Sequence, residues 1–519
     1  MTDQVEKWGL FEVSCRARVS GNPFEADFGA EFQHSEHSVK VAGFYDGEGV
    51  FKVRFMPQIE GEWTYTTYSD VRDLEGQQGR FACVAPSSDN HGPVGVVDSL
   101  RFAYADGTPY IPVGTTCYVW NLQGDELEEQ TSRTLEQAPF NKMRMCVFPK
   151  RYTFNMNEPP SYPFPRKVTQ SEKTSRTGEP SNDWDFSRFN PDYFQHLEKR
   201  ILDLQRRGIE ADLILFHPYD SGAWGFDRMP AEVNDRYLKY LVARLASFRN
   251  LWWSFANEYD LFPERTMQDW DHYMQLVQQI DPYDHLRSIH NCMAFYDHTK
   301  PWVTHCSIQS GYVHRVPLWM KKYGKPIVID ECGYEGDIHM VWGDLSPEEM
   351  VLRFWIGFTL GGYVTHGETY VNPEEVLWWS KGGQLRGESV PRIAFLREIF
   401  EQAPAAGLTP IGRIDNETVN MLEGTPGLFD QSSDVDRIIA EGRWNVEAGG
   451  YCGNDYFMFY FGMHQPGSRN FNLPPGSFRI DVIDTWNMTL ESVAENASGE
   501  VTVALPGRKY MAIRIVRRA

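Results

Sequence analysis

The chain lacks the features that mark an exported or membrane-bound protein. Its first residues, MTDQVEKWGL, have neither the cationic start nor the apolar segment that a secretory signal needs. No run of about 18 apolar residues occurs, so no membrane-spanning helix is expected. These absences predict a cytoplasmic protein that does not bind a membrane.

Positive charge is scarce. The 519 residues include 50 Lys and Arg against 71 Asp and Glu, which gives a formal net charge of −21. Because nucleic-acid binding needs clustered cations that neutralise phosphates, no nucleic-acid partner is expected. The negative charge would neither attract nor repel a neutral oligosaccharide substrate. The sequence is also compatible with a homo-oligomer.

Motifs for disulfides, metals and nucleotides are also missing. The eight cysteines are scattered without a CxxC pair, which indicates reduced thiols rather than a disulfide frame or a zinc site. No two histidines stand four residues apart on a predicted helix, and no glycine-rich dinucleotide loop follows a predicted strand. We therefore expect no metal and no other cofactor.

Three sections of the chain differ in hydrophobic pattern. Residues 1–90 contain short runs that alternate apolar and polar side chains, such as FEVSCRARV and VFKVRFMP, which is typical of an antiparallel β-sandwich. Residues 91–405 alternate apolar strands with amphipathic helices, as parallel β/α folds do. Residues 406–519 return to short strands and predict a small C-terminal all-β domain.

The central section contains eight strand candidates. Their number, and a length of roughly 300 residues, predict an α/β fold of the (β/α)₈ TIM-barrel type, with a doubly wound open sheet as the alternative. The candidates are PYIPVGTT (109–116), NKMRMCVFP (141–149), ADLILFHP (211–218), LWWSFANE (251–258), HLRSIHNC (285–292), VTHCSIQS (303–310), KPIVIDE (325–331) and GGYVTHGE (361–368).

Polar side chains end most of these apolar strands. The active site of such a barrel lies at the carboxyl ends of its strands, so these side chains are expected to converge there. Each one alone has an ordinary structural explanation, and only their convergence indicates a functional site. The candidate substrate-binding residues are Arg144, His217, Asn257, His290, His305, Gln309, Trp120 and Trp379.

Two carboxyl groups are candidate catalytic residues, because each ends an otherwise buried strand. Glu258 ends the fourth strand and Glu331 ends the seventh, which faces the fourth across an eight-stranded barrel. Glycoside hydrolysis needs such a pair, one carboxyl protonated and the other ionised. Burial among aromatic residues would keep Glu258 protonated, while Arg144 and neighbouring donors would keep Glu331 charged. Metal-assisted hydrolysis is the competing chemistry.

The motifs Asn257-Glu258 and Glu331-Cys332-Gly333 resemble the strand ends of the clan A retaining glycoside hydrolases. That resemblance implies an acid/base role for Glu258, a nucleophile role for Glu331, and substrate-contacting or orienting roles for Arg144 and His217. The segments KWGLFEV and EGEWTY, together with the C-terminal β-domain, are similar to those of bacterial apiosidase-like proteins. The resemblance covers essentially the whole chain.

The resulting hypothesis is a retaining exo-glycosidase that removes terminal sugars from small oligosaccharides of plant or microbial polysaccharides. The resemblance favours a furanoside or a deoxy-hexose, with a β-linked pyranoside as the alternative. A transglycosylase and a non-catalytic sugar-binding protein also remain open. The long connection at 150–190 is expected to fold over the site and to supply its aromatic walls, Tyr152, Phe154, Tyr162, Phe164 and Trp184.

Overall fold

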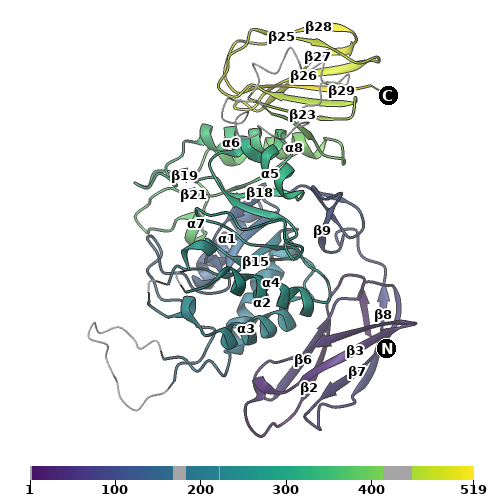
Figure 1. Cartoon of the computed structure of the whole chain (residues 1–519), viewed down its shortest axis with the longest axis vertical. Coiled ribbons are helices and arrows are strands. Elements are labelled where there is room, and N and C mark those ends of the chain that lie inside the picture. Colours follow the sequence, from purple (N-terminus) through teal and green to yellow (C-terminus); the bar gives the residue numbers. More distant parts are fainter. Residues whose placement is uncertain (1–2, 168–182, 221, 263, 413–446, 519) are drawn as a thin grey trace.

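The computed structural model describes residues 3–167, 183–220, 222–262, 264–412 and 447–518. Three parts are stacked along the longest axis of the molecule, with the N-terminal strands at one end, the barrel in the middle and the C-terminal strands at the other end (Figure 1). The described ranges contain no helix that is both long enough and apolar enough to cross a membrane.

The N-terminal part is formed by two sheets. Phe32 of one sheet stacks on Phe55 of the other, with ring centroids 4.2 Å apart, so the alternating apolar side chains meet between the sheets. A short 3₁₀ helix, η1 (Pro23–Glu25), lies between β2 and β3. The first sheet has the order β1 (Asp3–Glu6), β8 (Gln78–Val84), β7 (Gly61–Ser69), β3 (Phe28–His34), β4 (His37–Ala42), and the second β2 (Phe11–Arg16), β6 (Val50–Phe55), β5 (Phe44–Tyr45).

The central part is the predicted parallel barrel. Hydrogen bonds join the first strand, β12, to the last, β20, and a single bridge between His290 and Ser307 links β16 to β17. In chain order the strands are β12 (Gly114–Thr116), β13 (Lys142–Cys146), β14 (Glu210–Phe216), β15 (Leu251–Ala256), β16 (Arg287–Ser288), β17 (Cys306–Gln309), β18 (Ile327–Glu331) and β20 (Tyr363–His366).

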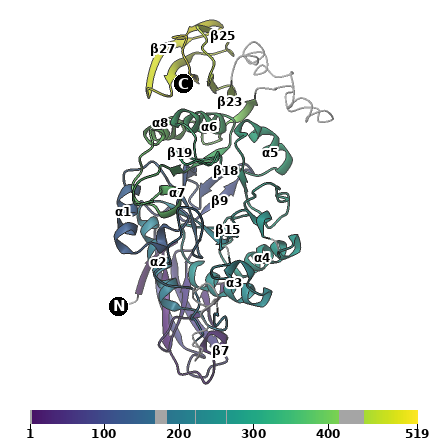
Figure 2. The same cartoon turned by 90° about the vertical axis from the view of Figure 1, so that its left-hand side faces the viewer.

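Helices surround these strands in a ring (Figure 2). Their ends carry the expected signals, such as the capping box of Thr266 and Asp269 and the proline at the start of the helix that begins at Pro191. The chain from β16 to β17 contains no helix. The helices are α1 (Asp125–Leu135), α2 (Pro191–Arg206), α3 (Ala231–Leu245), α4 (Met267–Ile280), α5 (Val316–Tyr323), α6 (Pro347–Thr359), α7 (Trp378–Lys381) and α8 (Ser389–Glu401), with 3₁₀ turns η2 (Trp120–Leu122), η3 (Phe226–Arg228), η4 (Tyr259–Leu261) and η5 (Val313–Arg315).

Two small sheets mark the opposite ends of the barrel. At the amino end, β9 (Val94–Val97), β10 (Arg101–Tyr104) and β11 (Pro109–Tyr110) bring the Phe102 ring against Trp252 and His305. At the carboxyl end, β19 (Glu335–Gly336) pairs with β21 (Glu368–Thr369). The barrel is therefore covered at its base and open to loops at its other end.

The C-terminal part is all β-structure and packs on α6 and α8 of the barrel. Trp355 of α6 stacks on Tyr460, with ring centroids 5.6 Å apart, and also contacts Phe400 of α8. Its main sheet has the order β22 (Thr409–Gly412), β23 (Ala448–Cys452), β24 (Tyr456–Tyr460), β29 (Met511–Arg517), β26 (Phe478–Asp484), β27 (Thr489–Ala497), and a second sheet pairs β25 (Ser468–Asn472) with β28 (Glu500–Ala504).

A buried ionic cluster joins the N-terminal part to the barrel. Arg54 of β6 donates to the Arg244 carbonyl (2.8 Å) and pairs with Glu198 of α2 (2.8 Å). Arg244 in turn pairs with Glu198 (2.6 Å) and with Asp46 (2.8 Å). Since removal of one partner from a buried ion pair leaves an uncompensated charge, these contacts hold the two parts in one fixed arrangement.

Candidate active site

Glu258 and Glu331 stand at the carboxyl ends of β15 and β18. The Asn257 N–H donates to the Phe216 carbonyl (3.0 Å), so the pairing of β14 with β15 continues one residue past the strand. Glu258 then adopts a left-handed backbone, with φ 48° and ψ 57°. That conformation costs a residue other than glycine about 1–3 kcal/mol, and such strain concentrates at functional sites. The turn ends the strand abruptly and keeps the Glu258 side chain buried.

The Glu258 carboxyl group is protonated more readily than an ordinary glutamate. Burial raises its pKa to about 7, and the neighbouring charge of Glu331 acts in the same direction. Hydrogen bonds with Gln309 and Cys292 and the positive charge of Lys150 oppose this rise without cancelling it. A carboxyl group with a pKa near neutrality can act first as an acid and then as a base.

The Glu331 carboxyl group is shifted the other way. Burial raises its pKa, but the contact with His290, the Tyr334 hydroxyl and the charge of Lys150 outweigh burial, so the pKa lies below its usual value. The Tyr118 hydroxyl is 3.3 Å from Glu331 Oε2 and can donate to it. Two neighbouring carboxyl groups with opposite shifts suit an acid and a nucleophile.

Two cations and two carboxylates neutralise one another inside the barrel. Lys142 Nζ donates to Asp212 (2.6 Å) and Asp330 (2.7 Å), and Arg144 pairs with Asp330 (3.0 Å). Arg144 was expected, together with neighbouring donors, to keep Glu331 charged. Its ion-pair partner on β18 is instead Asp330, because side chains alternate along the strand. Arg144 is fully buried and donates to Asn257 Oδ1 (2.8 Å). It orients Asn257, the residue before Glu258.

His290 and Gln309 form a hydrogen-bonded group between the two glutamates. His290 Nε2 lies 3.2 Å from Gln309 Oε1 and 3.8 Å from Glu331 Oε2, while its Nδ1 lies 3.1 Å from Ser307 Oγ. Gln309 also bonds the Glu258 carboxyl. These two predicted site residues therefore lie in one network with both carboxyl groups.

Aromatic rings and one lysine enclose this group. Trp379 packs against Tyr118, with ring centroids 5.8 Å apart, and its carbonyl accepts from the Tyr118 N–H (3.0 Å). The Lys150 ammonium lies over the rings of Tyr118 (3.8 Å), Tyr219 (4.3 Å) and Trp379 (4.4 Å). Burial lowers the Lys150 pKa to about 8, so the ammonium remains mostly charged at neutral pH. Within the described ranges this ammonium has no acidic or carbonyl hydrogen-bond partner.

Sequence analysis missed Lys150, Tyr118, Tyr219 and Tyr334. Tyr118 follows the end of β12 by two residues, Lys150 follows β13 by four, and Tyr219 and Tyr334 follow β14 and β18 by three each. The rule that sites lie just past the strand ends would have found them if it had been extended by one turn. Their position just past the strand ends could have identified these four residues as site residues, whereas their residue types could not.

Two of the predicted substrate-binding residues lie away from the carboxyl groups. His305 precedes β17 at the amino end, where it packs against Phe102 and Trp252. Trp120 is fully buried in η2, beneath the Arg200 guanidinium of α2. Both placements correct the expectation of substrate contact: His305 begins its strand instead of ending it, and Trp120 turns outward from the barrel.

His217 holds Tyr219, part of the aromatic wall of the site, in place. Its Nε2–H donates to the Phe148 carbonyl (3.1 Å), and its Nδ1 accepts from the Tyr219 N–H (3.2 Å). Burial lowers its pKa to about 4, so the ring is neutral. Because the Tyr219 hydroxyl accepts from Asn257 Nδ2 (3.4 Å), His217 helps to fix the aromatic wall beside Asn257.

The long connection after β13 divides into two parts. Tyr152 lies beside Tyr219 and Trp379, with ring centroids 5.3 and 6.2 Å away, and so belongs to the site wall. Phe164 and Trp184 instead pack against Phe226 in a buried aromatic cluster, which corrects their expected role as sugar-binding walls. Residues 168–182 of this connection lie outside the described residues.

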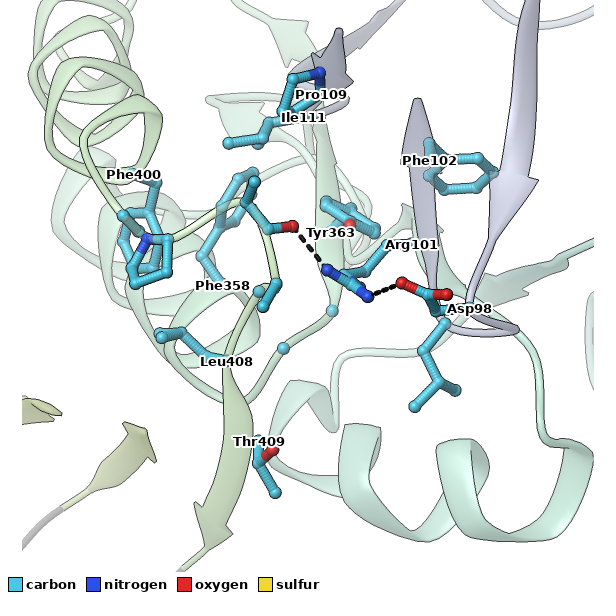
Figure 3. Close-up of a pocket in the computed structure, with 18 of the residues that line it drawn as sticks. Asp98, Arg101, Phe102, Pro109, Ile111, Phe358, Tyr363, Phe400, Leu408 and Thr409 are labelled. Carbon is cyan, nitrogen blue, oxygen red and sulfur yellow. Dashed lines mark hydrogen bonds and ion pairs between the residues drawn. The ribbon is translucent and has the colours of Figure 1, made fainter. Parts of the chain in front are cut away.

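Other polar groups and hollows lie elsewhere. Asp125, Glu128 and His196 are close enough to hold a metal, but Arg200 donates to Glu128 (2.6 Å) and Asp125 (3.2 Å) and neutralises the cluster. A cavity of about 430 Å³ lies at the amino end, between Phe102, Tyr363, Phe400 and Leu408 (Figure 3). Neither feature is near the two glutamates.

The fold and the carboxyl pair define a class, the glycoside hydrolases with a TIM barrel. A family model described as "Apiosidase-like, catalytic domain" matches residues 98–404. The chain belongs to this family and is a glycoside hydrolase. Models for domains of unknown function, DUF5060 and DUF5605, match residues 4–70 and 444–516.

Solved structures agree with this assignment. A Bacteroides vulgatus protein named as a candidate glycoside hydrolase is 40% identical, with full coverage of both chains and a TM-score of 0.89. A glycoside hydrolase family 5 protein from the same species is 14% identical over 82% of this chain and 94% of its own, with a TM-score of 0.58, and shares the fold. The comparison with curated protein sequences gave no match.

Proposed function

We propose that this glycoside hydrolase is a retaining exo-glycosidase that releases terminal sugars from small oligosaccharides. Glu331 attacks the anomeric carbon, while Glu258 protonates the leaving oxygen. Glu258 then removes a proton from the water that releases the sugar from Glu331. The opposite pKa shifts of these two buried carboxyl groups are the observation that carries the proposal.

The surroundings of the carboxyl groups support action on a chain end. Glu258 and Glu331 are only 8% and 9% exposed. Tyr118, Tyr152 and Trp379 enclose them together with Lys150. An enclosed site of this kind suits one terminal sugar better than the middle of a polymer. The family assignment supports a furanoside as the first substrate class to test, drawn from plant or microbial polysaccharides.

The nucleophile can be tested by substitution of Glu331. Glu331→Ala should remove hydrolysis of every substrate, because no glycosyl-enzyme can form. Added azide should restore cleavage of nitrophenyl substrates by attacking the anomeric carbon itself, which releases the nitrophenol and gives a glycosyl azide of inverted configuration. Glu331→Gln provides the matched variant of nearly equal size, and melting curves of both proteins confirm that they are folded.

The stereochemical outcome is a separate test. A screen of nitrophenyl glycosides, with arabinofuranosides and galactofuranosides beside β-pyranosides, identifies a substrate. NMR of the first-formed product then gives its anomer. Retained configuration supports double displacement, whereas inverted configuration would replace Glu331 as nucleophile by an activated water and leave the hydrolase class intact.

A further inference from the structure

Lys150 is a buried cation whose charge no ion pair within the described ranges neutralises. The residue is 2% exposed. Its ammonium lies 3.8, 4.3, 4.4 and 5.3 Å from the ring centroids of Tyr118, Tyr219, Trp379 and Tyr152. Ring faces attract a cation, but they do not replace the hydrogen bonds that an ammonium makes in water. The three N–H donors of Lys150 are therefore available to a ligand.

The other two buried cations of the barrel interior have carboxylate partners. Lys142 Nζ donates to Asp212 (2.6 Å) and Asp330 (2.7 Å), and Arg144 pairs with Asp330 (3.0 Å). A buried charge without such a partner is costly, and costly ionisable groups concentrate at functional sites. This contrast distinguishes Lys150 from a cation that only stabilises the fold.

The backbone on both sides of the Lys150 carbonyl is fixed. The Arg151 N–H donates to the Tyr219 carbonyl (2.8 Å), and the buried Asn155 side chain donates to the Lys150 carbonyl. The aromatic rings then restrict the side chain itself. Because the ammonium is held in place without a ligand, a ligand would not have to order it on binding.

The ammonium lies beside the place of the terminal sugar. The Tyr118 hydroxyl is 3.3 Å from Glu331 Oε2, and Glu331 is the carboxylate that bonds to the anomeric carbon of that sugar in the proposed mechanism. The ammonium is over the ring of the same tyrosine. Its positive charge acts on both Glu258 and Glu331. A group in this position borders the sugar that is released.

We propose that Lys150 binds a negatively charged substituent of the terminal sugar, so that the substrate is an acidic sugar. The inference rests on the retaining exo-glycosidase function proposed above and adds a substrate class to it. One ammonium balances one negative charge, which fits the carboxylate of a uronic acid or the sulfate ester of a sulfated sugar. The requirement concerns the substituent and not the ring size, so it applies to furanosides and pyranosides.

The charge of the whole protein makes this local cation necessary. The formal net charge of −21 would repel an anionic substrate at long range. Inside the site, the Lys142 and Arg144 charges are balanced by Asp212 and Asp330. Lys150 is then the cation that remains to attract an anion at the two glutamates.

A second effect of Lys150 must be separated from binding. Its charge also favours ionised Glu331, and the loss of that effect would slow the reaction of every substrate alike. A binding role predicts in addition a selection between acidic and neutral sugars. The ratio of kcat/KM on an acidic substrate to kcat/KM on its neutral counterpart therefore isolates the binding role, because the common effect cancels.

The ratio can be measured with paired nitrophenyl substrates, a β-glucuronide beside a β-glucoside and a β-galacturonide beside a β-galactoside. Lys150→Met keeps the apolar contacts of the side chain and removes the charge. The ratio should fall about 10–100-fold in Lys150→Met, the effect of one lost charged hydrogen bond. Lys150→Arg keeps the charge and should recover part of the ratio. An unchanged ratio in Lys150→Met overturns the inference.

Binding to the full chain gives a test without hydrolysis, and it decides the question if none of these substrates is cleaved. The probes are sodium glucuronate, sodium galacturonate, glucose 6-sulfate and galactose 6-sulfate, with glucose and galactose as neutral partners, all at one ionic strength. Acidic sugars should raise the melting temperature of the unaltered protein more than neutral ones, and Lys150→Met should lose this difference. A response to uronates assigns a carboxylate, and a response to the sulfated sugars assigns a sulfate ester.

The outcomes separate this inference from the proposed function. Binding of an acidic sugar that requires Lys150, in a protein that hydrolyses no glycoside, would place the failure in the proposed function. Hydrolysis of neutral glycosides without any preference for acidic sugars would overturn the inference alone. A lowered melting temperature of Lys150→Met with an unchanged binding preference would show a structural cation and would also overturn it.

Discussion

The two ends of the barrel both bury a glutamate with a raised pKa. At the carboxyl end burial raises that of Glu258 to about 7, and at the amino end burial raises that of Glu210 to about 8. Glu210 accepts from Trp252 Nε1 (3.1 Å), and the same end of the barrel holds Phe102 and the cavity of Figure 3. A raised pKa alone therefore does not identify a catalytic acid.

The surroundings separate these glutamates. Glu258 adjoins a second carboxyl group of opposite shift, a buried cation and aromatic walls. Glu210 adjoins the Trp252 indole, Arg249 and apolar packing. The comparison teaches that the second carboxyl group and the open loops past the strand ends are what distinguish the candidate active end.

The largest expected difference between the ends concerns catalysis. Glu258→Ala should lower kcat/KM by about 10²–10⁴-fold on substrates with poor leaving groups, because these need protonation. Nitrophenyl substrates should keep a fast first step and accumulate the glycosyl-enzyme, visible as a burst. Glu210→Gln should leave the same rates unchanged. Equal losses in both variants would contradict the comparison.

A substitution at the amino end should instead lower the stability of the protein and leave catalysis unchanged. Phe102→Ala removes a buried ring that contacts Trp252, His305 and Tyr363 at the amino end. Its free energy of unfolding should fall by about 3–5 kcal/mol, as measured by denaturant titration. Rates per folded molecule should be unchanged, since the described ring contacts of Phe102 all lie at the amino end. A lowered kcat/KM in fully folded protein would count against this separation.

Two buried histidines sharpen the comparison. His290→Ala should lower kcat about 10²-fold, the effect of displaced reacting groups, because it removes the partner of Gln309 and Ser307. His305→Ala should affect only stability, since His305 contacts Phe102 and Trp252. Steady-state rates together with melting temperatures separate the two outcomes, and a rate loss in His305→Ala would refute the assignment.

The amino end should also show a pH dependence of stability. The folded pKa of Glu210, about 8, exceeds that of an unfolded glutamate, 4.5, so the folded state binds the proton more tightly. Stability from this group is present below pH 4.5 and is lost as pH rises towards 8, by at most about 1.4 kcal/mol per pH unit. Glu210→Gln should lose less stability across this range. Parallel unfolding curves for the two proteins would contradict the shift.

The activity of the unaltered enzyme should have its own pH limits. Glu258 must be protonated in the first step, so kcat/KM should fall as pH rises through about 7. Glu331 must be ionised, so activity should fall only below the ordinary glutamate pKa of 4.5. A bell-shaped profile between these limits is expected, whereas a profile with no alkaline limb would argue against Glu258 as the acid.

The sequence alone predicted the eight strands and the two strand-end glutamates. Apolar runs of strand length between amphipathic helices specify a parallel barrel, and a barrel places its strand ends at one rim. This reasoning brought Glu258, Glu331, Asn257, His290 and Gln309 to one place. The local hydrophobic pattern was sufficient there, because each of these residues lies at the carboxyl end of its strand or within two residues after it.

The tertiary structure decided which candidate residues reach the site, which the hydrophobic pattern of the sequence did not define. His290 and His305 look alike in sequence, but the strand begins after His305, so only His290 reaches the carboxyl end. Lys150 and Tyr118 lie on loops that reach the site, and the path of these loops depends on packing. Arg144 forms its ion pair with Asp330 instead of Glu331. Burial and charge act through distances between residues that are far apart in the chain, and only folding sets those distances.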